Sequence, residues 1–429
     1  MINNLHYFFE DAVAQKVLLG VAVIGFIAGI VGVFSFLRKK TLVADAISHA
    51  VLPGVCVGFI FAGTKDPVVL MIAAVVVGWL SVWMIDMIVR TTKLTEDAAI
   101  AIISTFFFAI GSVLLSYISK SENAEQTGLK NFLFGNAATM TELDVNVFVI
   151  VSLVILFVVV LFFKQFKLFC FDEAFSKVIG LKVKSIEFLL STLTVLTVAI
   201  GIQAVGVVLM SALLIAPASA ARYWTNKLSL MLVIAGLFGL FSGVSGVVIS
   251  TFKDGMPTGP WIVTVLFLFT ILTLLFAPKK GWYSIKRLNN FNKFKIMEEN
   301  LLKVFFQYLE NGKEELKVIE ILEKRPVETN DLEKVLARLI KKGFLLKKGL
   351  KYQLTINGNV EAMRIVRSHR LWELYLTKRM KFKDDHIHGS AETIEHLITP
   401  EIELELLKEL DFPKEDPHNK AIPYDDRDK

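Results

Sequence analysis

The sequence predicts an all-α polytopic membrane protein with about nine transmembrane helices, followed by a smaller soluble region. Hydrophobic residues make up 54% of the 429 residues, and the mean hydropathy of +0.56 is too high for an ordinary soluble enzyme. Charge is unevenly placed, because residues 1–278 contain 17 Lys/Arg and 15 Asp/Glu whereas residues 279–429 contain 30 and 26. We therefore expect a membrane domain over residues 1–278 and a soluble region after it.

Runs of about 20 apolar residues, the length that a helix needs to cross a bilayer, occur nine times along the first part of the chain. The predicted spans cover residues 17–37, 42–63, 67–89, 97–118, 145–163, 186–203, 205–224, 228–251 and 258–277. The sixth and seventh spans are the hardest to separate, because the segment from Gly201 to Gly206 fits either two helices or one broken helix.

Basic residues in the connecting loops predict the orientation of these spans. With the N-terminus outside, the inner loops contain fourteen Lys/Arg, whereas the outer loops contain Lys65, Lys120, Lys130 and Lys253, with Lys16 at the edge of the first span. This asymmetry obeys the positive-inside rule and places the C-terminus in the cytoplasm. The N-terminus lacks a basic n-region, so no cleavable signal peptide is predicted.

The segment T-L-V-A-D-A-I-S-H-A-V-L-P-G contains the ionisable pair Asp45 and His49 inside the second predicted span. Residues four apart share one face of a helix. Each such group costs about 2.5–3.5 kcal/mol on insertion scales, so two together call for a reason. A carboxylate and an imidazole suit manganese, iron(II) or zinc. The alternative is a buried polar pair that is hydrogen-bonded to neighbouring helices.

The two cysteines, Cys56 and Cys170, are too few for a disulfide scaffold or a Cys-rich zinc site. Cys56 lies seven residues after His49 on nearly the same helix face. It is either a soft third ligand or a small core residue, and the second interpretation is favoured because free cysteines are often buried.

The longest inner loop, residues 164–184, contains F-D-E-A-F-S-K-V-I-G-L. This pattern predicts a short amphipathic helix that begins at Asp172 and is closed by Gly180. Such a helix could receive force from a motor subunit, or it could be a solvated connector. The chain has no G-x-x-x-x-G-K-[ST] motif and no nucleophile elbow, so we expect neither nucleotide binding nor an enzyme active site.

After a predicted linker at residues 279–296, the soluble region begins with three amphipathic helices. They are expected from residue 297, near 313–324 and near 330–342, and the run from Phe344 to Thr355 predicts a hairpin with Gly349 in its turn. Three helices and a hairpin are typical of a winged-helix domain, here residues 297–356. Residues 357–429 are expected to be helical again.

Histidine and glutamate cluster in this last region at the spacing of metal ligands. Five of the seven histidines lie between residues 369 and 418. The candidate ligands, arranged along helix faces, are His369, Glu373, His388, Glu392, Glu395 and His396. A solvated charged face is the alternative. A metal site is favoured because His388, Glu392, Glu395 and His396 fall on one face of a helix.

The membrane part resembles the permeases of bacterial manganese, zinc and iron ABC transporters. The resemblance rests on L-V-A-D-A-I-S-H-A-V-L-P-G, D-E-A-F-S-K-V-I-G-L, L-M-S-A-L-L-I-A-P-A-S-A-A-R and M-P-T-G-P. It implies that Asp45 and His49 form the intramembrane metal site. It also implies that the segment with Asp172, Glu173, Ala174 and Gly180 docks on the ATPase.

As a whole, this resemblance implies metal import through a multi-pass protein of the prokaryotic inner membrane. ATP would be hydrolysed by a separate subunit, and the metal would be delivered by an extracytoplasmic binding protein. A second permease copy, identical or different, would complete the pathway. Manganese or iron is favoured over zinc as the divalent ion.

Residues 297–423 resemble the diphtheria-toxin-repressor family, in which a winged helix precedes a metal-binding and dimerisation domain. The resemblance assigns His369, Glu373 and His388 to an ancillary site and Glu392, Glu395 and His396 to a primary site. The sequence departs from that family at Asn300, where a ligand is expected, and at the acidic start of the third helix. The first departure concerns the metal site. The acids at the start of the third helix, where a DNA-reading helix needs positive charge, disfavour DNA binding. The tail is interpreted as a metal sensor that regulates uptake; the alternatives are a membrane-tethered, metal-dependent transcriptional regulator and a module that only dimerises.

Overall fold

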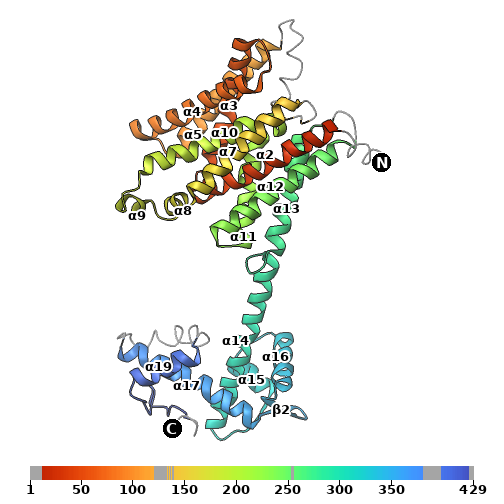
Figure 1. Ribbon diagram of the computed structural model, residues 1–429. Coiled ribbons are helices and arrows are strands. Elements are labelled where there is room, and N and C mark those ends of the chain that lie inside the picture. Colours follow the sequence, from red (N-terminus) through yellow and green to blue (C-terminus); the bar gives the residue numbers. More distant parts are fainter. Residues whose placement is uncertain are drawn as a thin grey trace. The chain divides into compact units, whose positions relative to one another are not determined.

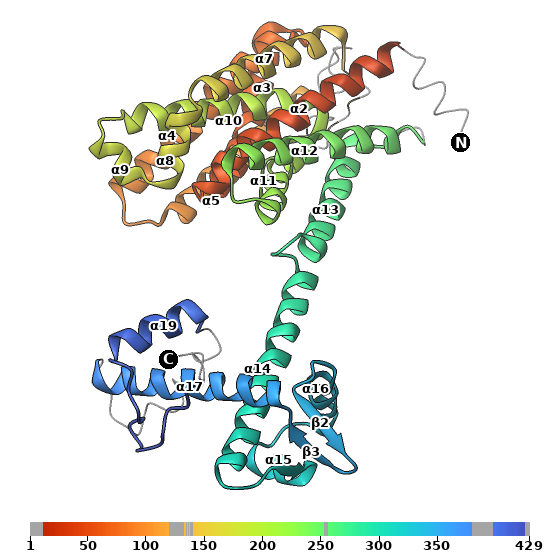
Figure 2. The same cartoon turned by 60° about the horizontal axis from the view of Figure 1, so that its bottom comes forward.

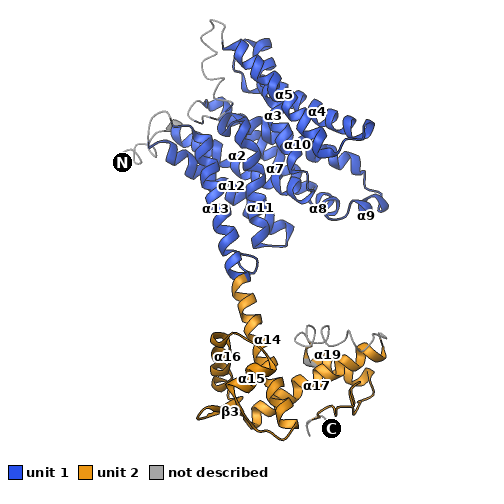
Figure 3. Ribbon diagram, turned by 180° about the vertical axis from the view of Figure 1, so that it is seen from behind, with its two compact units in different colours: residues 1–285 blue, residues 286–429 orange. Residues whose placement is uncertain are grey.

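Two compact units make up the computed structural model, residues 1–285 and residues 286–429 (Figure 3). The structure describes residues 12–119, 133, 135, 137, 140–252, 256–379 and 398–424. Each unit is described by itself.

Unit 1 is a bundle of helices (Figure 1). Within the described residues, nine helices are long and apolar enough to cross a membrane, which confirms the predicted number of spans. They are α2 (Ala12–Leu37), α3 (Thr41–Ala62), α4 (Pro67–Thr91), α5 (Glu96–Ile118), α7 (Glu142–Leu161), α10 (Val183–Val205), α11 (Val207–Trp224), α12 (Leu228–Ser250) and α13 (Thr258–Phe276).

The sixth and seventh spans are two helices rather than one. Helix α10 ends at Val205 and α11 begins at Val207, with Gly206 between them at a φ of +91°. This backbone region is open to glycine and strained for other residues, so glycine permits the chain to break here without a loop. The question left open by the sequence is thereby settled.

Glycines allow the central helices to approach closely. A Cβ atom on Gly25 of α2 would lie 2.3 Å from the carbonyl oxygen of Gly239 of α12, so neither position accepts a larger residue without a shift. Small residues at such crossings are common in membrane bundles, where packing rather than the hydrophobic effect drives association. Helices α2 and α3 are the most enclosed of the nine. In each of them, 72% of the residues in an apolar segment of 18 residues are buried, against 28% in α13. Helix α3, with Asp45 and His49, therefore lies in the bundle interior.

Two short helices, α8 (Phe163–Phe171) and α9 (Glu173–Val178), connect α7 to α10. Figure 2 shows them together at one end of the bundle. The Arg38 guanidinium, in the α2–α3 connection, lies 4.4 Å from the ring centroid of Phe169 in α8. We call this end, with α8, α9 and the α2–α3 connection, the α9 end.

Unit 2 begins within α14 (Trp282–Glu310), a 29-residue helix that starts inside the segment expected to be a linker. The elements that follow are β1 (Glu315–Lys317), α15 (Val318–Lys324), α16 (Thr329–Lys341), β2 (Leu345–Lys348), β3 (Lys351–Leu354), α17 (Ile356–Lys378) and α19 (Pro400–Glu409). The strands form an antiparallel sheet in the order β1-β3-β2.

The predicted hairpin is confirmed, with Gly349 in its turn at a φ of +61°. The prediction of one helix over residues 313–324 is wrong at residues 315–317. These form β1 instead, because Leu316 is fully buried beside its sheet partner Tyr352. The winged-helix core contains Leu301, Phe305 and Leu336, and a smaller cluster with Leu371 and Leu407 joins α17 to α19.

Candidate functional site

Local sequence shapes helix α3 around the acid–imidazole pair. Proline at position 53 lies within the helix and has no N–H, so the carbonyl of His49, four residues earlier, lacks its usual intrahelical donor. Gly54 permits α4 to approach, since a Cβ there would lie 2.8 Å from the carbonyl oxygen of Ala73. The helix ends at Ala62 with Gly63 in the left-handed conformation.

Asp45 and His49 lie on one face of α3, as the spacing predicts. The distance from Asp45 Oδ1 to His49 Nε2 is 3.9 Å, and the two side chains are 40% and 20% exposed in this single chain. The imidazole packs edge-on against Phe108 of α5, with ring centroids 5.0 Å apart. Its buried Nδ1 has no hydrogen-bond partner among the described residues. The Asp45 carboxylate is therefore partly open to its surroundings, whereas the imidazole keeps one buried nitrogen that no described residue hydrogen-bonds.

Cys56 does not join this pair. Its side chain is fully buried, and its thiol donates toward the carbonyl oxygen of Gly111 in α5, 3.8 Å away. The thiol is therefore engaged with the wall between α3 and α5, which supports the interpretation of Cys56 as a core residue. Within the part of the chain that the structure describes, no cluster of three or more His, Cys, Asp or Glu side chains is placed to hold a metal ion.

Helix α9 has the local structure that its sequence predicts. The Asp172 carboxylate accepts a hydrogen bond of 2.8 Å from the backbone N–H of Phe175 and so caps the helix, and Glu173 pairs with Lys177 at 2.7 Å. Gly180 follows at a φ of +83°. Asp172, Glu173, Ala174 and Gly180 are all exposed, and so are the apolar side chains of Phe175 and Val178, the latter 83% exposed. The α9 end thus presents a short, partly apolar helix to its surroundings.

In the tail, His369 and Glu373 form a second acid–imidazole pair, on α17. His369 Nε2 and Glu373 Oε1 are 3.0 Å apart, and both side chains are nearly fully buried. A buried nitrogen and a buried carboxylate oxygen at this distance suit two ligands of one transition metal ion. The other predicted ligands, His388, Glu392, Glu395 and His396, lie outside the described residues.

Asn300, the position where the sequence departs from the resembled repressors, is buried at 7% exposure. It lines a small cavity together with Ile321 and Leu332 in the winged-helix core. Its neighbour Glu299 lies near Lys295, with 3.7 Å between ammonium and carboxylate.

Comparison with known proteins identifies the family. Residues 10–277 match the model of the ABC 3 transport family. The chain belongs to the ABC 3 transport family. It is a multi-pass membrane permease. As an ABC 3 permease it carries an added domain, because residues 355–424 match the iron dependent repressor, metal binding and dimerisation domain.

This ABC 3 permease is similar to two curated relatives whose names state a metal, and to one solved structure. The manganese transport system membrane protein MntC of Bacillus subtilis is 37% identical over 392 residues, which are 89% of this chain and 88% of that one. The zinc transport system membrane protein TroC of Treponema pallidum is 42% identical over 65% of this chain and 94% of its own. The structure "PsaBC from Streptococcus pneumoniae in complex with Fab" matches with a TM-score of 0.61 and 33% identity, over 67% of this chain and all of the other.

Among the features that sequence reasoning missed in this ABC 3 permease is a charged cluster around Glu187. Glu187 of α10 binds both Arg38 and Lys40 at the α9 end, across 149 and 147 residues of sequence. The only available signal was a single acid just inside a predicted span, which gives no indication of its partners.

Proposed function

We propose that this permease carries divalent transition metal ions across the membrane as one subunit of an ATP-driven importer. The observation that supports this most directly is the Asp45–His49 pair, which places a carboxylate and an imidazole 3.9 Å apart on an interior membrane helix. Ionisable groups in such positions are costly and typically mark an ion pathway. Oxygen and nitrogen donors together suit first-row transition metals.

The geometry of the pair fits a site that holds its cargo briefly. Two ligands at about 2.1 Å from one ion lie about 3.0–3.4 Å apart, so small side-chain rotations from 3.9 Å would allow both to bind. The carbonyl of His49, freed by Pro53, is a further oxygen donor at the same level of the helix. Two side chains are fewer than the four ligands of a stable transition metal site.

The remaining ligands would come from a second permease copy. Asp45 is 40% exposed within one chain, so the pair is open to a neighbouring subunit on its free side. A symmetric dimer presents the same side chains twice across its axis. Two half-sites would then form one complete site in the pathway between the copies, and separating them would release the ion.

Energy and delivery would come from other subunits. The exposed apolar side chains of α9, Phe175 and Val178, provide a surface on which an ABC ATPase could dock. The predicted topology places α9 and the C-terminus in the cytoplasm and the N-terminus outside, where an extracytoplasmic binding protein would deliver the metal.

Element-by-element analysis of metal accumulation tests this function. In cells that lack their own importers, the complete transporter should raise cellular manganese or iron more than zinc, because the tail resembles sensors for those metals. His49→Ala should reduce accumulation to the level of cells without the transporter. Ser48→Ala is the matched control, since the neighbouring Ser48 hydroxyl donates to the Ala44 carbonyl of its own helix. Accumulation by His49→Ala equal to that of the wild type would contradict the proposal.

For the tail, we propose that metal bound by His369, Glu373 and the residues His388, Glu392, Glu395 and His396 inhibits uptake. The charges of α16 favour this role over DNA recognition. Arg338 and Lys342 lie 3.7 and 2.5 Å from Glu298 of α14, and Asp331 at the start of α16 binds Lys293 at 2.6 Å. Basic side chains held by acids are less available to phosphates. If the full chain in lipid nanodiscs bound metal-dependently to a DNA operator, the transcriptional alternative would replace regulation of uptake.

A further inference from the structure

The α2–α3 connection is tied to α10 by one carboxylate. Glu187 Oε1 accepts hydrogen bonds from Arg38 Nη2 at 2.6 Å and from Lys40 Nζ at 2.9 Å. The Lys40 ammonium also lies 3.6 Å from Glu96 at the start of α5. The three side chains of the Glu187 cluster, Arg38, Lys40 and Glu187, are between 12% and 33% exposed, so water screens them only partly.

The same cluster reaches α8, the helix that leads into α9. The Arg38 guanidinium lies over the buried ring of Phe169, 4.4 Å from its centroid. One turn earlier, Phe166 packs edge-on against Phe34 of α2, with ring centroids 5.3 Å apart. Only Asp172, the cap of α9, separates the two short helices. The chain and its contacts therefore lead from α9 through α8 to Arg38.

At its other side, the cluster holds the beginning of the helix with the metal pair. Lys40 is the N-cap residue of α3, and Asp45 and His49 follow five and nine residues later. A lysine is unfavourable at this position, because a helix N-terminus carries partial positive charge and favours acids or hydroxyl caps. Its side chain makes no cap hydrogen bond and binds Glu187 instead. The sequence thus has a residue that is unfavourable for capping α3 at a position where its side chain can bind α10.

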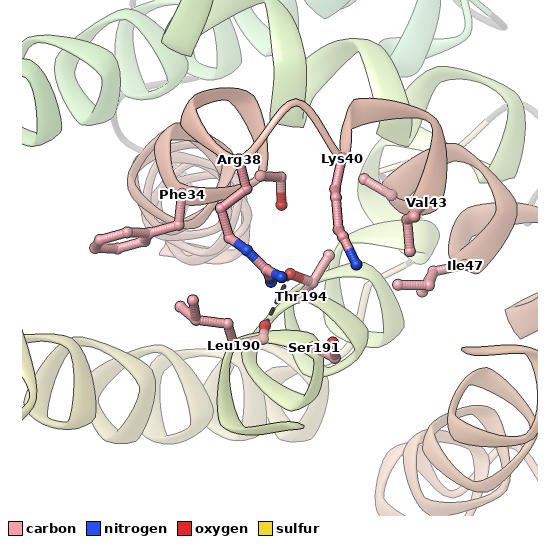
Figure 4. A pocket seen from close by; sticks show the side chains of 10 residues that line it. Phe34, Arg38, Lys40, Val43, Ile47, Leu190, Ser191 and Thr194 are labelled. Carbon is pink, nitrogen blue, oxygen red and sulfur yellow. Dashed lines mark hydrogen bonds between the residues drawn. The ribbon is translucent and has the colours of Figure 1, made fainter. Parts of the chain in front are cut away.

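Packing alone does not join α3 to α10 at this point. A cavity of about 30 Å³ lies between them, lined by Arg38, Lys40, Ala44, Ile47, Leu190 and Thr194, among others. Figure 4 shows Arg38 and Lys40 extending from the α2–α3 connection toward α10 around this space. Protein interiors are usually close-packed, and a gap of this size has room for one or two water molecules. Arg38 and Lys40, the two partners of Glu187, therefore line a gap in the packing between α3 and α10.

We propose that Glu187 is a positioning residue that couples α9 to the metal pair. When the ATPase moves α9, the contact of Phe169 with Arg38 displaces the connection held by Glu187, and the first turns of α3 move with it. Asp45 and His49 then change their exposure in step with ATP hydrolysis. The inference rests on the proposed function, because it presumes that uptake is driven through α9.

The number of metal ions imported per ATP hydrolysed measures this coupling. The complete transporter, with its ATPase and binding protein, is reconstituted in liposomes, and the wild type is compared with Glu187→Gln. Glutamine keeps the shape and one acceptor oxygen but removes the charge that holds Arg38 and Lys40. We expect the ATPase to remain bound and to hydrolyse ATP, while the ratio of imported metal to ATP falls by about tenfold, within the usual range of coupling between sites.

Two further variants separate coupling from docking and from general electrostatics. Val178→Asp changes the most exposed apolar side chain of α9, so it should lose the ATPase itself and both activities together. Glu142→Gln removes the partner of Lys16 in α2, an exposed pair outside the Glu187 cluster, and should leave the ratio unchanged. A ratio in Glu187→Gln equal to that of the wild type would overturn the proposal.

Arg38→Lys decides the question if Glu187→Gln fails to fold, as judged by its thermal unfolding midpoint. Lysine keeps the charge toward Glu187 but lacks the planar group that lies over Phe169. We expect a smaller fall in the ratio, and an unchanged ratio would again overturn the role of this contact. A wild-type transporter that hydrolyses ATP but imports no metal would instead refute the proposed function itself.

Discussion

Two acid–imidazole pairs with the same four-residue spacing lie in very different surroundings in this molecule. Asp45 and His49 are 3.9 Å apart and 40% and 20% exposed, on a membrane helix interrupted by proline. His369 and Glu373 are 3.0 Å apart and 9% and 2% exposed, on the uninterrupted helix α17. An open, incomplete pair suits an ion that must leave again, whereas a buried pair suits an ion that is held. Spacing alone therefore identifies candidate ligands but not their task.

Removing the carboxylate of the membrane pair should have the largest effect. Loss of a partner that only orients a ligand lowers metal affinity about 10–100-fold, so loss of a direct ligand in Asp45→Asn should lower uptake by about a hundredfold or more. Radiotracer uptake into proteoliposomes measures this. Metal binding by the tail should be unchanged in the same preparation. Uptake close to that of the wild type would show that Asp45 is not a ligand of the transported ion. The contrast between the two pairs would then not hold.

Removing the carboxylate of the tail pair should give the converse result. Glu373→Gln should leave uptake at low metal unchanged and raise the metal concentration needed for half-inhibition by about 10–100-fold, because a buried ligand is lost. Uptake is measured over a series of cytosolic metal concentrations. Glu405→Gln, an exposed glutamate on α19, is the matched control. Inhibition of Glu373→Gln at the wild-type concentration would show that this pair does not sense metal.

Cys56 tests whether the membrane pair has a third ligand on its own helix. Its thiol is directed at the Gly111 carbonyl and is fully buried, so Cys56→Ala should destabilise the fold by about 1 kcal/mol without changing metal affinity. The thermal unfolding midpoint and the metal concentration for half-maximal uptake measure the two effects separately. If that concentration rose about tenfold, a soft ligand would have to be added to the pair.

Properties carried by local sequence were predicted well. Span length and hydropathy are local, so the nine membrane helices among the described residues were predicted. The cost of charge in an apolar helix marks Asp45 and His49 as candidate ligands; their shared helix face is observed, and their role as ligands stays a prediction. Glycine signals predicted the turn at Gly349, and Gly206, in the segment left open, proved to be the break between α10 and α11. The four tail ligands from His388 to His396 remain predictions, because they lie outside the described residues.

Properties that depend on distant partners were not predicted. The binding of Glu187 to Arg38 joins residues 149 positions apart, and no local pattern indicates it. The strand at residues 315–317 has only three residues and owes its conformation to pairing with β3, so its sequence alone fits a helix. Whether a carboxylate is paired, and whether a pair is open or buried, are likewise consequences of packing. The two acid–imidazole pairs differ in exposure and in distance, and both differences come from the packing around them.

The smallest expected effect concerns the stability of the tail away from its metal pair. The pKa of Glu315, a residue of β1, is lowered below its usual 4.5. The cause is a hydrogen bond of 2.9 Å from Lys351 of β3, together with the charges of Lys351 and Lys348. A lowered folded pKa means that the stabilisation is present above the unfolded pKa and is lost as pH falls through the folded value. The pair is exposed, so its contribution is small.

Hydrogen exchange of the β1 and β3 amides measures this contribution in the full chain. Below pH 4.5, protection in the wild type should decline toward that of Glu315→Gln, whose protection relative to intrinsic exchange should vary less with pH. Glu405→Gln should follow the wild type at every pH. Metal inhibition of uptake should be the same in Glu315→Gln and in the wild type, because Glu315 belongs to the winged-helix sheet and not to α17. A shift in inhibition would mean that the winged helix and the metal pair act as one unit, and the contrast between the two pairs would then extend to the whole tail.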